Sequence, residues 1–181
     1  MESLDPGAAP GEPEAGVGYE ALWREWRPRA AAYARAFGGL SAEDREELAD
    51  EAVARAWEAR ARFRAGSPFA PWFFQIVRRL ALDALRRRCE EPKPPAFFEG
   101  QGSSPPEAEE AALRDAEAEF VRRFVAGLPS RDRELSSLVY GQGLGLAEAA
   151  CVLGVPAGTA KWRLSEIRKA LRRAWEREYG E

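Results

Sequence analysis

Residues 146–164 read LAEAACVLGVPAGTAKWRL, and this stretch decides how the second half of the chain folds. Its apolar spacing predicts two short helices, 146–153 and 157–177, joined by Gly154-Val155-Pro156. Ala150 is small enough for the second helix to cross the first there, and Gly154 tolerates the positive φ that the turn requires. The pattern therefore predicts a helix-turn-helix.

The predicted second helix of this motif has two different faces. A small core between the two helices is predicted for Leu153, Val155, Ala160 and Leu164. The outward face is predicted to carry Gly158, Thr159, Lys161, Trp162 and Ser165, backed by Arg163, Arg168, Lys169, Arg172 and Arg173. Neutralising phosphates supplies most of the affinity of such modules, so the charge favours duplex DNA as the ligand. A solvated basic helix with no ligand is the alternative.

The formal net charge of −3 hides two basic segments. Residues 76–88 contain five arginines and one aspartate, and residues 151–177 contain seven basic residues and two glutamates. Residues 1–20 carry five acids and no bases, and residues 92–119 carry seven acids and two bases. This distribution indicates contact with a polyanion at two places along the chain.

The remaining apolar periodicity predicts only helices. They are expected at Tyr19–Phe37, Ser41–Phe63, Pro71–Arg88, Glu107–Gly127 and Pro129–Gly141, with Ser41 as an N-cap. The tryptophans Trp23, Trp26, Trp57 and Trp72 fall at helical spacing and are predicted to pack in the core.

The predicted fold class is all-α, with two small helical domains joined by a flexible Pro-rich linker, the C-terminal one a helix-turn-helix. The expected boundaries are a disordered acidic tail at 1–18, a first domain at 19–91, the linker at 92–107 and a second domain at 108–181.

The composition argues against several classes of function. The chain has no histidine, so the commonest general base and metal ligand are both missing. Its two cysteines, Cys89 and Cys151, suit neither a structural zinc site nor a disulfide framework. No catalytic residue, metal or cofactor is predicted. No apolar run approaches the roughly 18–20 residues that cross a bilayer, and the amino terminus lacks the features of a signal peptide. We expect a cytoplasmic protein without membrane insertion that is not an enzyme.

Both halves of the chain resemble the extracytoplasmic-function (ECF) group of bacterial RNA polymerase sigma factors. The C-terminal half is similar to region 4 of that family through Leu128-Pro129, Arg133, Glu148-Ala149-Ala150, Leu153-Gly154 and the run GTAKWR at 158–163. The N-terminal half is similar to region 2 through the run LADEA at 48–52 and through Phe69, Trp72, Ile76, Asp83 and Arg86.

The resemblance implies a sigma factor that binds core RNA polymerase and directs promoter recognition and transcription initiation. Its polymerase contacts would be the β′ clamp helices and the β flap, the former through Glu47, Leu48, Asp50, Glu51 and Val53. Region 2 would capture an unpaired base of the −10 element with Phe63, Arg64, Ala65, Gly66 and Ser67, beside Arg78, Arg79 and Arg86. Region 4 would read the −35 duplex with Thr159, Lys161, Trp162, Arg163, Ser165, Glu166 and Lys169. An anti-sigma protein is a further expected partner, and the holoenzyme would associate with the nucleoid.

Four residues depart from the family pattern. Arg79 stands where the family has an asparagine, Trp162 where it has a small serine, Glu166 where many members have an arginine, and Asp50 where a glutamine is usual. Two alternatives stay open. One is a helix-turn-helix regulator that acts without polymerase, which would not need the unit at 41–88. The other is a sigma-like mimic that sequesters an anti-sigma partner, which Arg79, Trp162 and Glu166 favour.

Overall fold

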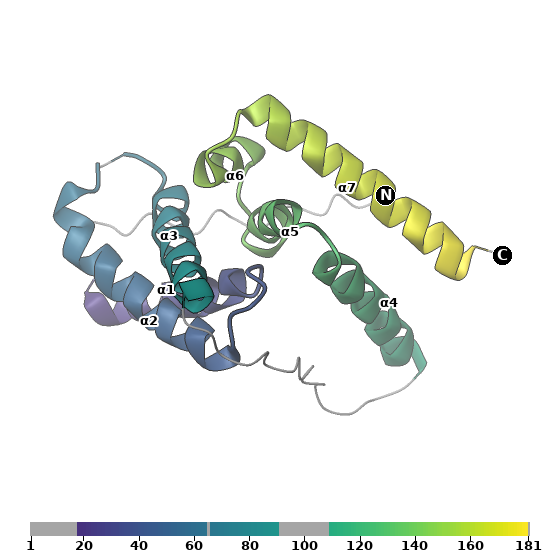
Figure 1. Cartoon of the computed structure of the whole chain (residues 1–181), viewed down its shortest axis with the longest axis horizontal. Helices are drawn as coiled ribbons and strands as arrows, with labels where there is room; N and C mark the ends of the chain where they lie inside the picture. Colours follow the sequence, from purple (N-terminus) through teal and green to yellow (C-terminus); the bar gives the residue numbers. More distant parts are fainter. Residues whose placement is uncertain (1–17, 65, 91–108, 181) are drawn as a thin grey trace.

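The computed structural model describes residues 18–64, 66–90 and 109–180, and every regular element in those ranges is helical. The N-terminal unit contains α1 (Tyr19–Ala34), α2 (Ala42–Ala59), the 3₁₀ turn η1 (Arg60–Arg62) and α3 (Phe69–Glu90). The C-terminal unit contains α4 (Glu109–Ala126), α5 (Ser130–Ser136), the π-helical turn η2 (Ser137–Gly141), α6 (Leu146–Leu153) and α7 (Ala157–Tyr179). The predicted all-α class is confirmed (Figure 1). The linker predicted at 92–107 and residues 1–17 of the predicted tail lie outside the described residues.

Aromatic side chains hold the N-terminal unit together. Trp26 of α1 is 1% exposed and packs edge-on against Phe69 and Phe73 of α3, with ring centroids 4.7 and 5.1 Å away. Tyr33 lies about two helical turns after Trp26 and contacts Phe74, with their ring centroids 5.3 Å apart. Trp23 is 40% exposed, so the expectation that it packs in the core is wrong. Its indole N–H instead donates to Asp50 at the surface.

The starts of α2 and α3 follow from the residues at their amino ends. Ser41 is the N-cap of α2, as predicted: its hydroxyl accepts from the Asp44 N–H at 3.1 Å, and the Asp44 carboxylate accepts from the Ser41 N–H at 2.6 Å. Helix α3 begins at Phe69, two residues before the predicted start at Pro71. Pro71 lies in its first turn, where a missing N–H costs no hydrogen bond.

The helix-turn-helix is present as predicted and consists of α6, the turn and α7. Gly154 caps α6 with a φ of +66°, and the Val155 N–H donates to the Ala150 carbonyl at 3.0 Å. Ala160 and Leu164 are buried in the small core, whereas Leu153 and Val155 are half-buried and pack against it. The sequence reading missed two further core residues of this motif, Val152 and Ile167.

The last turns of α7 pack against α4. Phe120 of α4 meets Trp175 and Tyr179 of α7 at centroid distances of 5.2 and 5.7 Å. Arg123 and Glu178 form an ion pair beside these rings at 2.5 Å. Figure 1 shows the two helices side by side. This contact extends α7 to Tyr179, two residues beyond its predicted end.

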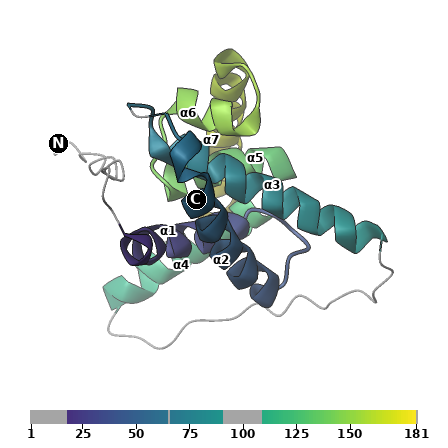
Figure 2. The same ribbon diagram turned by 90° about the vertical axis from the view of Figure 1, so that its left-hand side faces the viewer.

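The two units also pack against each other. Helix α6 contacts α3, and η2 contacts α1. In Figure 2, α6 lies on one side of α3, with α1 and α2 on the other. Apart from Phe120, the buried apolar residues of both units form one continuous cluster. The sequence reading expected two units on a tether and did not predict this contact.

Candidate nucleic-acid interface

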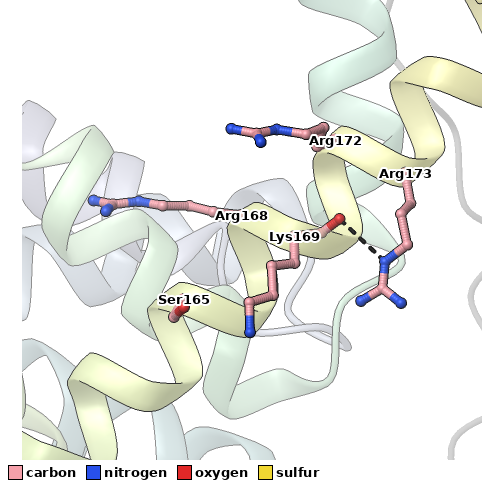
Figure 3. A pocket seen from close by; sticks show the side chains of 5 residues that line it. All are labelled: Ser165, Arg168, Lys169, Arg172 and Arg173. Carbon is pink, nitrogen blue, oxygen red and sulfur yellow. Dashed lines mark hydrogen bonds between the residues drawn. The ribbon is translucent and has the colours of Figure 1, made fainter.

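The outer face of α7 carries a concentration of positive charge. Ser165, Arg168, Lys169, Arg172 and Arg173 line a surface pocket along the helix. Figure 3 shows Arg168 and Arg172 extending to one side of α7 and Lys169 and Arg173 to another. The Arg173 Nε donates to the Lys169 carbonyl at 3.3 Å, which holds its guanidinium against the helix. The six residues 168–173 hold four cations and no acid, which suits contact with a chain of phosphates.

The predicted base-reading residues begin at the amino end of α7. Thr159, Lys161, Trp162 and Ser165 are exposed, and Trp162 presents 62% of its surface to solvent. A tryptophan this exposed makes no contribution to the core that would explain its position. These predicted base-reading side chains are therefore accessible in this arrangement of the two units.

Two predicted DNA-contacting residues of α7 are paired within the protein. Arg163 forms an ion pair with Asp132 of α5 at 2.7 Å, and the two side chains are 31% and 19% exposed. Glu166 accepts a hydrogen bond from Lys169 at 2.9 Å, one helical turn further on. This contact places a cation beside the carboxylate, so Glu166 is not an isolated negative charge on the surface of α7.

The structure adds Tyr140 to this surface, which sequence reasoning missed. Tyr140 is 57% exposed, and its hydroxyl accepts a hydrogen bond from Arg168 Nε at 2.6 Å. It lies in η2, whose wider turn displaces its side chain from the regular helical period. A 3.6-residue periodicity offers no signal for such a position.

The loop predicted to capture an unpaired base lies over an aromatic cluster. Phe63 is half-buried and contacts Phe69 and Trp72, with centroids 5.5 and 5.1 Å away. Arg64 and Gly66 are exposed, Ser67 is half-buried, and Gly66 has a φ of +80°. Ala65 lies outside the described residues. The partly exposed rings of Phe63 and Trp72 offer apolar surface on which a base can stack.

The three cations predicted on α3 have different surroundings. Arg79 and Arg86 are exposed, and Arg86 lies 3.4 Å from Asp83. Arg78 instead points into the contact between the two units, where its Nε donates to Glu134 of α5 at 2.7 Å. The structure therefore does not bring Arg78 to the same open surface as Arg79.

The surface of α2 holds only part of the predicted polymerase-facing set. Glu47, Asp50 and Glu51 are exposed, whereas Leu48 and Val53 are 4% and 0% exposed. The expectation that these two side chains belong to an exposed contact surface is corrected by their burial, because both pack in the core beneath the helix. The acidic side chains are the ones that a partner can reach.

The described ranges contain neither a membrane-spanning helix nor a cluster of metal ligands. Within residues 18–64, 66–90 and 109–180, no helix is long and apolar enough to cross a membrane. In the same ranges, no three side chains among Cys, Asp and Glu gather in a way that would hold a metal ion.

Known proteins resemble this chain in both units. Residues 22–89 match the family model for Sigma-70 region 2, and residues 121–171 match that for Sigma-70 region 4. The RNA polymerase sigma-H factor of Pseudomonas aeruginosa is 30% identical over 145 residues, which cover 74% of each chain. The ECF RNA polymerase sigma factor RpoE of Cereibacter sphaeroides is 29% identical over 153 residues, 84% of this chain and 81% of the relative. This chain belongs to the ECF family of sigma factors.

Further proteins similar to this sigma factor include one longer relative and two solved structures. The probable RNA polymerase sigma factor RfaY of Xanthomonas campestris is 33% identical to this chain over 132 residues. The matched stretch covers 70% of this chain but only 33% of RfaY, so this chain spans about a third of the length of RfaY. Two solved structures share the fold. The sigma factor RpoE in complex with the anti-sigma factor NepR from Bartonella quintana has a TM-score of 0.65 at 22% identity, covering 87% of this chain and 96% of that one. CnrH in complex with the cytosolic domain of CnrY has a TM-score of 0.61 at 23% identity, covering 87% of each.

The family matches give the two units of this ECF sigma factor their names. The region 2 match begins in α1 and ends in α3, and the region 4 match begins in α4 and ends in α7. The contacts of α6 with α3 and of η2 with α1 therefore join region 4 to region 2.

Proposed function

We propose that this ECF sigma factor binds core RNA polymerase and directs it to promoters, with region 2 at the −10 element and region 4 at the −35 element. The observation that carries the proposal is the exposed cationic face of α7 in a unit that matches region 4, in a chain that also contains region 2. A helix-turn-helix alone would support only duplex binding. The protein itself makes and breaks no covalent bond, and it acts in the cytoplasm.

Region 4 binds the major groove of the −35 duplex with the amino-terminal turns of α7. Lys169, Arg172 and Arg173 contact phosphates, which fixes the position of the helix without reading sequence. Thr159, Lys161, Trp162 and Ser165 are the residues that reach base edges, since they are exposed ahead of the cationic stretch. The exposed indole of Trp162 fits an apolar contact with a thymine methyl group.

Region 2 holds the melted strand of the −10 element. A base that has left the stack lies on the rings of Phe63 and Trp72, and the loop through Gly66 closes over it. Arg79 and Arg86 hold the neighbouring phosphates from α3. Arginine binds phosphate well but does not offer the paired donor and acceptor of an asparagine amide, so Arg79 favours backbone contact over base reading.

The partners of this sigma factor are core polymerase, promoter DNA and an anti-sigma protein. Glu47 and Glu51, exposed on α2, face the β′ clamp helices, with Asp50 between them. Region 4 contacts the β flap. One solved neighbour is a sigma factor in complex with an anti-sigma factor, which supports an inhibitor of that kind for this chain.

Reconstitution with core polymerase tests the proposal. The purified chain is mixed with core polymerase, the holoenzyme is isolated, and the genomic fragments that it retains are sequenced and transcribed in vitro. We expect a stable holoenzyme and transcripts from a subset of promoters that share −35 and −10 sequences. Footprints on duplex DNA without polymerase binding would favour the regulator alternative. Binding to an inhibitor without any transcript would favour the mimic.

A further inference from the structure

The cations of α7 lie on two flanks of the helix rather than in a single row. Arg168 and Arg172 extend to one side of the helix, and Lys169 and Arg173 extend to another (Figure 3). Arg168 and Arg173 are five positions apart, which separates them by about 140° around the axis of an α-helix. Cations on two flanks of one helix can reach two separate rows of phosphates.

Each flank contains an arginine that is anchored through its Nε atom. Arg168 Nε donates to the Tyr140 hydroxyl at 2.6 Å, and Arg173 Nε donates to the Lys169 carbonyl at 3.3 Å. Among the residues that the structure describes, no hydrogen bond or ion pair engages the Nη nitrogens of either arginine. These Nη groups therefore stay available for hydrogen bonds to phosphate oxygens, for which the planar guanidinium is well suited.

The anchor of Arg168 comes from outside α7. Tyr140 belongs to η2, 28 positions earlier in the sequence, and the core does not explain its place because it is 57% exposed. The guanidinium carbon of Arg168 also lies 5.8 Å from the centroid of the Tyr140 ring. Ordering a long side chain on binding costs conformational entropy, and a side chain that is already held loses less of it. Tyr140 thus orders Arg168 before any ligand arrives.

We propose that Tyr140 is a positioning residue for DNA binding, which holds Arg168 against the phosphates of one strand while Arg173 contacts those of the other. The proposal rests on the function proposed above, in which α7 enters the −35 duplex. The major groove is about 12 Å wide and a helix with its side chains is about 10–12 Å across, so each flank of α7 faces one wall of the groove. Contacts on both walls fix the rotation of the helix, which determines how Thr159 and Trp162 meet the base edges.

A double-mutant cycle tests whether Tyr140 acts through Arg168. The probe is the duplex that the whole chain enriches most from a random-sequence pool, and affinity is measured by fluorescence anisotropy at stepped salt. Tyr140→Phe removes the hydroxyl and keeps the ring, so we expect roughly two- to fivefold weaker binding with an unchanged salt slope, because no cation is lost. Arg168→Gln should lower the slope of log K against log salt by about 1. Adding Tyr140→Phe to Arg168→Gln should cause no further loss.

Tyr179→Phe is the matched control for the loss of a phenol. Tyr179 lies on α7 itself, is 45% exposed and packs on Phe120 rather than on a cation. Its loss of the hydroxyl should leave duplex affinity unchanged, and circular dichroism should show that both tyrosine variants are folded. A Tyr140→Phe effect that persists in the Arg168→Gln background would overturn the positioning role, and so would an equal loss for Tyr179→Phe.

Neutral methylphosphonate linkages, placed one at a time along either strand of the same duplex, test the assignment of the two flanks to two strands. Binding of the parent chain should weaken at sites on both strands, because each substitution removes one phosphate charge. Arg168→Gln should become insensitive at sites on one strand, and Arg173→Gln at sites on the other. Tyr140→Phe should lose part of its sensitivity at the Arg168 sites alone.

The outcomes separate this inference from the proposed function. A holoenzyme that transcribes promoters while Arg168 and Arg173 map to the same strand would overturn the inference alone. A chain that contacts both strands as described but supports no transcript with core polymerase would refute the proposed function alone. Failure of the chain to select any duplex, by itself or as holoenzyme, would overturn both.

Discussion

Arg27 of α1 binds the carboxylate of Asp50 on α2 with two hydrogen bonds, Nε–Oδ1 at 2.6 Å and Nη2–Oδ2 at 3.2 Å. The Trp23 indole N–H donates to the same Oδ1 at 3.2 Å. These hydrogen bonds hold the pKa of Asp50 below its ordinary value, and the bond from Arg27 has the larger effect. An aspartate at a position where the family usually has glutamine thus ties α1 to α2.

Asp50→Asn should lower the stability of region 2 only at neutral pH. Because folding lowers the pKa of Asp50, its contribution is present above the ordinary aspartate value of 3.8 and is lost as the pH falls through the folded-state value. The side chain is 50% exposed, so we expect a loss of less than about 1 kcal/mol at pH 7. Urea unfolding at neutral pH and in acid measures this. A difference between variant and parent that persists unchanged in acid would contradict the prediction.

Trp26→Ala should unfold or severely destabilise region 2. The side chain is 1% exposed and contacts two phenylalanines of α3, so its removal leaves a large cavity between α1 and α3. Losses of about 3–5 kcal/mol are typical of such truncations. Trp23→Ala is the control, since Trp23 is 40% exposed and its loss should cost no more than about 1 kcal/mol. Similar denaturation midpoints for the two variants would refute this assignment of the core.

The helical elements were predictable because their signals are local. Ser41 with Asp44 marked the start of α2, and Gly154 marked the turn of the helix-turn-helix, since each acts through its own backbone neighbourhood. The apolar period of α2 predicts that Leu48 and Val53 are buried, whereas the family resemblance assigns the same two side chains to a polymerase contact. The structure buries both, as the period predicts.

Gly154→Ala should destabilise region 4, because an alanine at a φ of +66° is strained whatever the surrounding space. The expected cost is about 1–2 kcal/mol. Gly158→Ala offers a matched comparison, since its Cβ would meet nothing within 4 Å and the residue is helical. It should be neutral or stabilising by up to about 1 kcal/mol. Thermal denaturation of both variants measures these changes in stability. Equal shifts of the unfolding temperature would mean that the turn tolerates a side chain.

Arg172→Gln should weaken duplex binding through the phosphate backbone. Losing one phosphate contact should reduce the slope of log K against log salt by about 1 and weaken binding to all sequences alike. Arg122→Gln, which removes an exposed cation paired with Glu119 on α4, serves as the control and should leave the slope unchanged. Fluorescence anisotropy with duplexes of several sequences at stepped salt measures both. A loss confined to one sequence would assign Arg172 to base reading instead.

The contacts between the units were the part that sequence reading did not supply. Arg29 and Gln142 are 113 positions apart, and Arg78 and Glu134 are 56 apart, so no periodicity relates them. Arg78 was expected among the DNA-contacting cations because the basic run at 76–88 gives each arginine the same weight. Only the packing of α5 and α6 on the N-terminal unit separates Arg78 from the exposed Arg79.

The π-helical turn η2 sets the angular position of everything that follows it in region 4. The Gln142 N–H donates to the Ser137 carbonyl at 2.9 Å, five residues earlier, so this turn holds one residue more than the ordinary helical spacing. Deleting a single residue there would rotate Gln142 by about 100° around the helix axis and away from Arg29. A variant with that deletion is expected to lose both hydrogen bonds between Arg29 and Gln142, so the contact between α1 and region 4 depends on the length of this one turn.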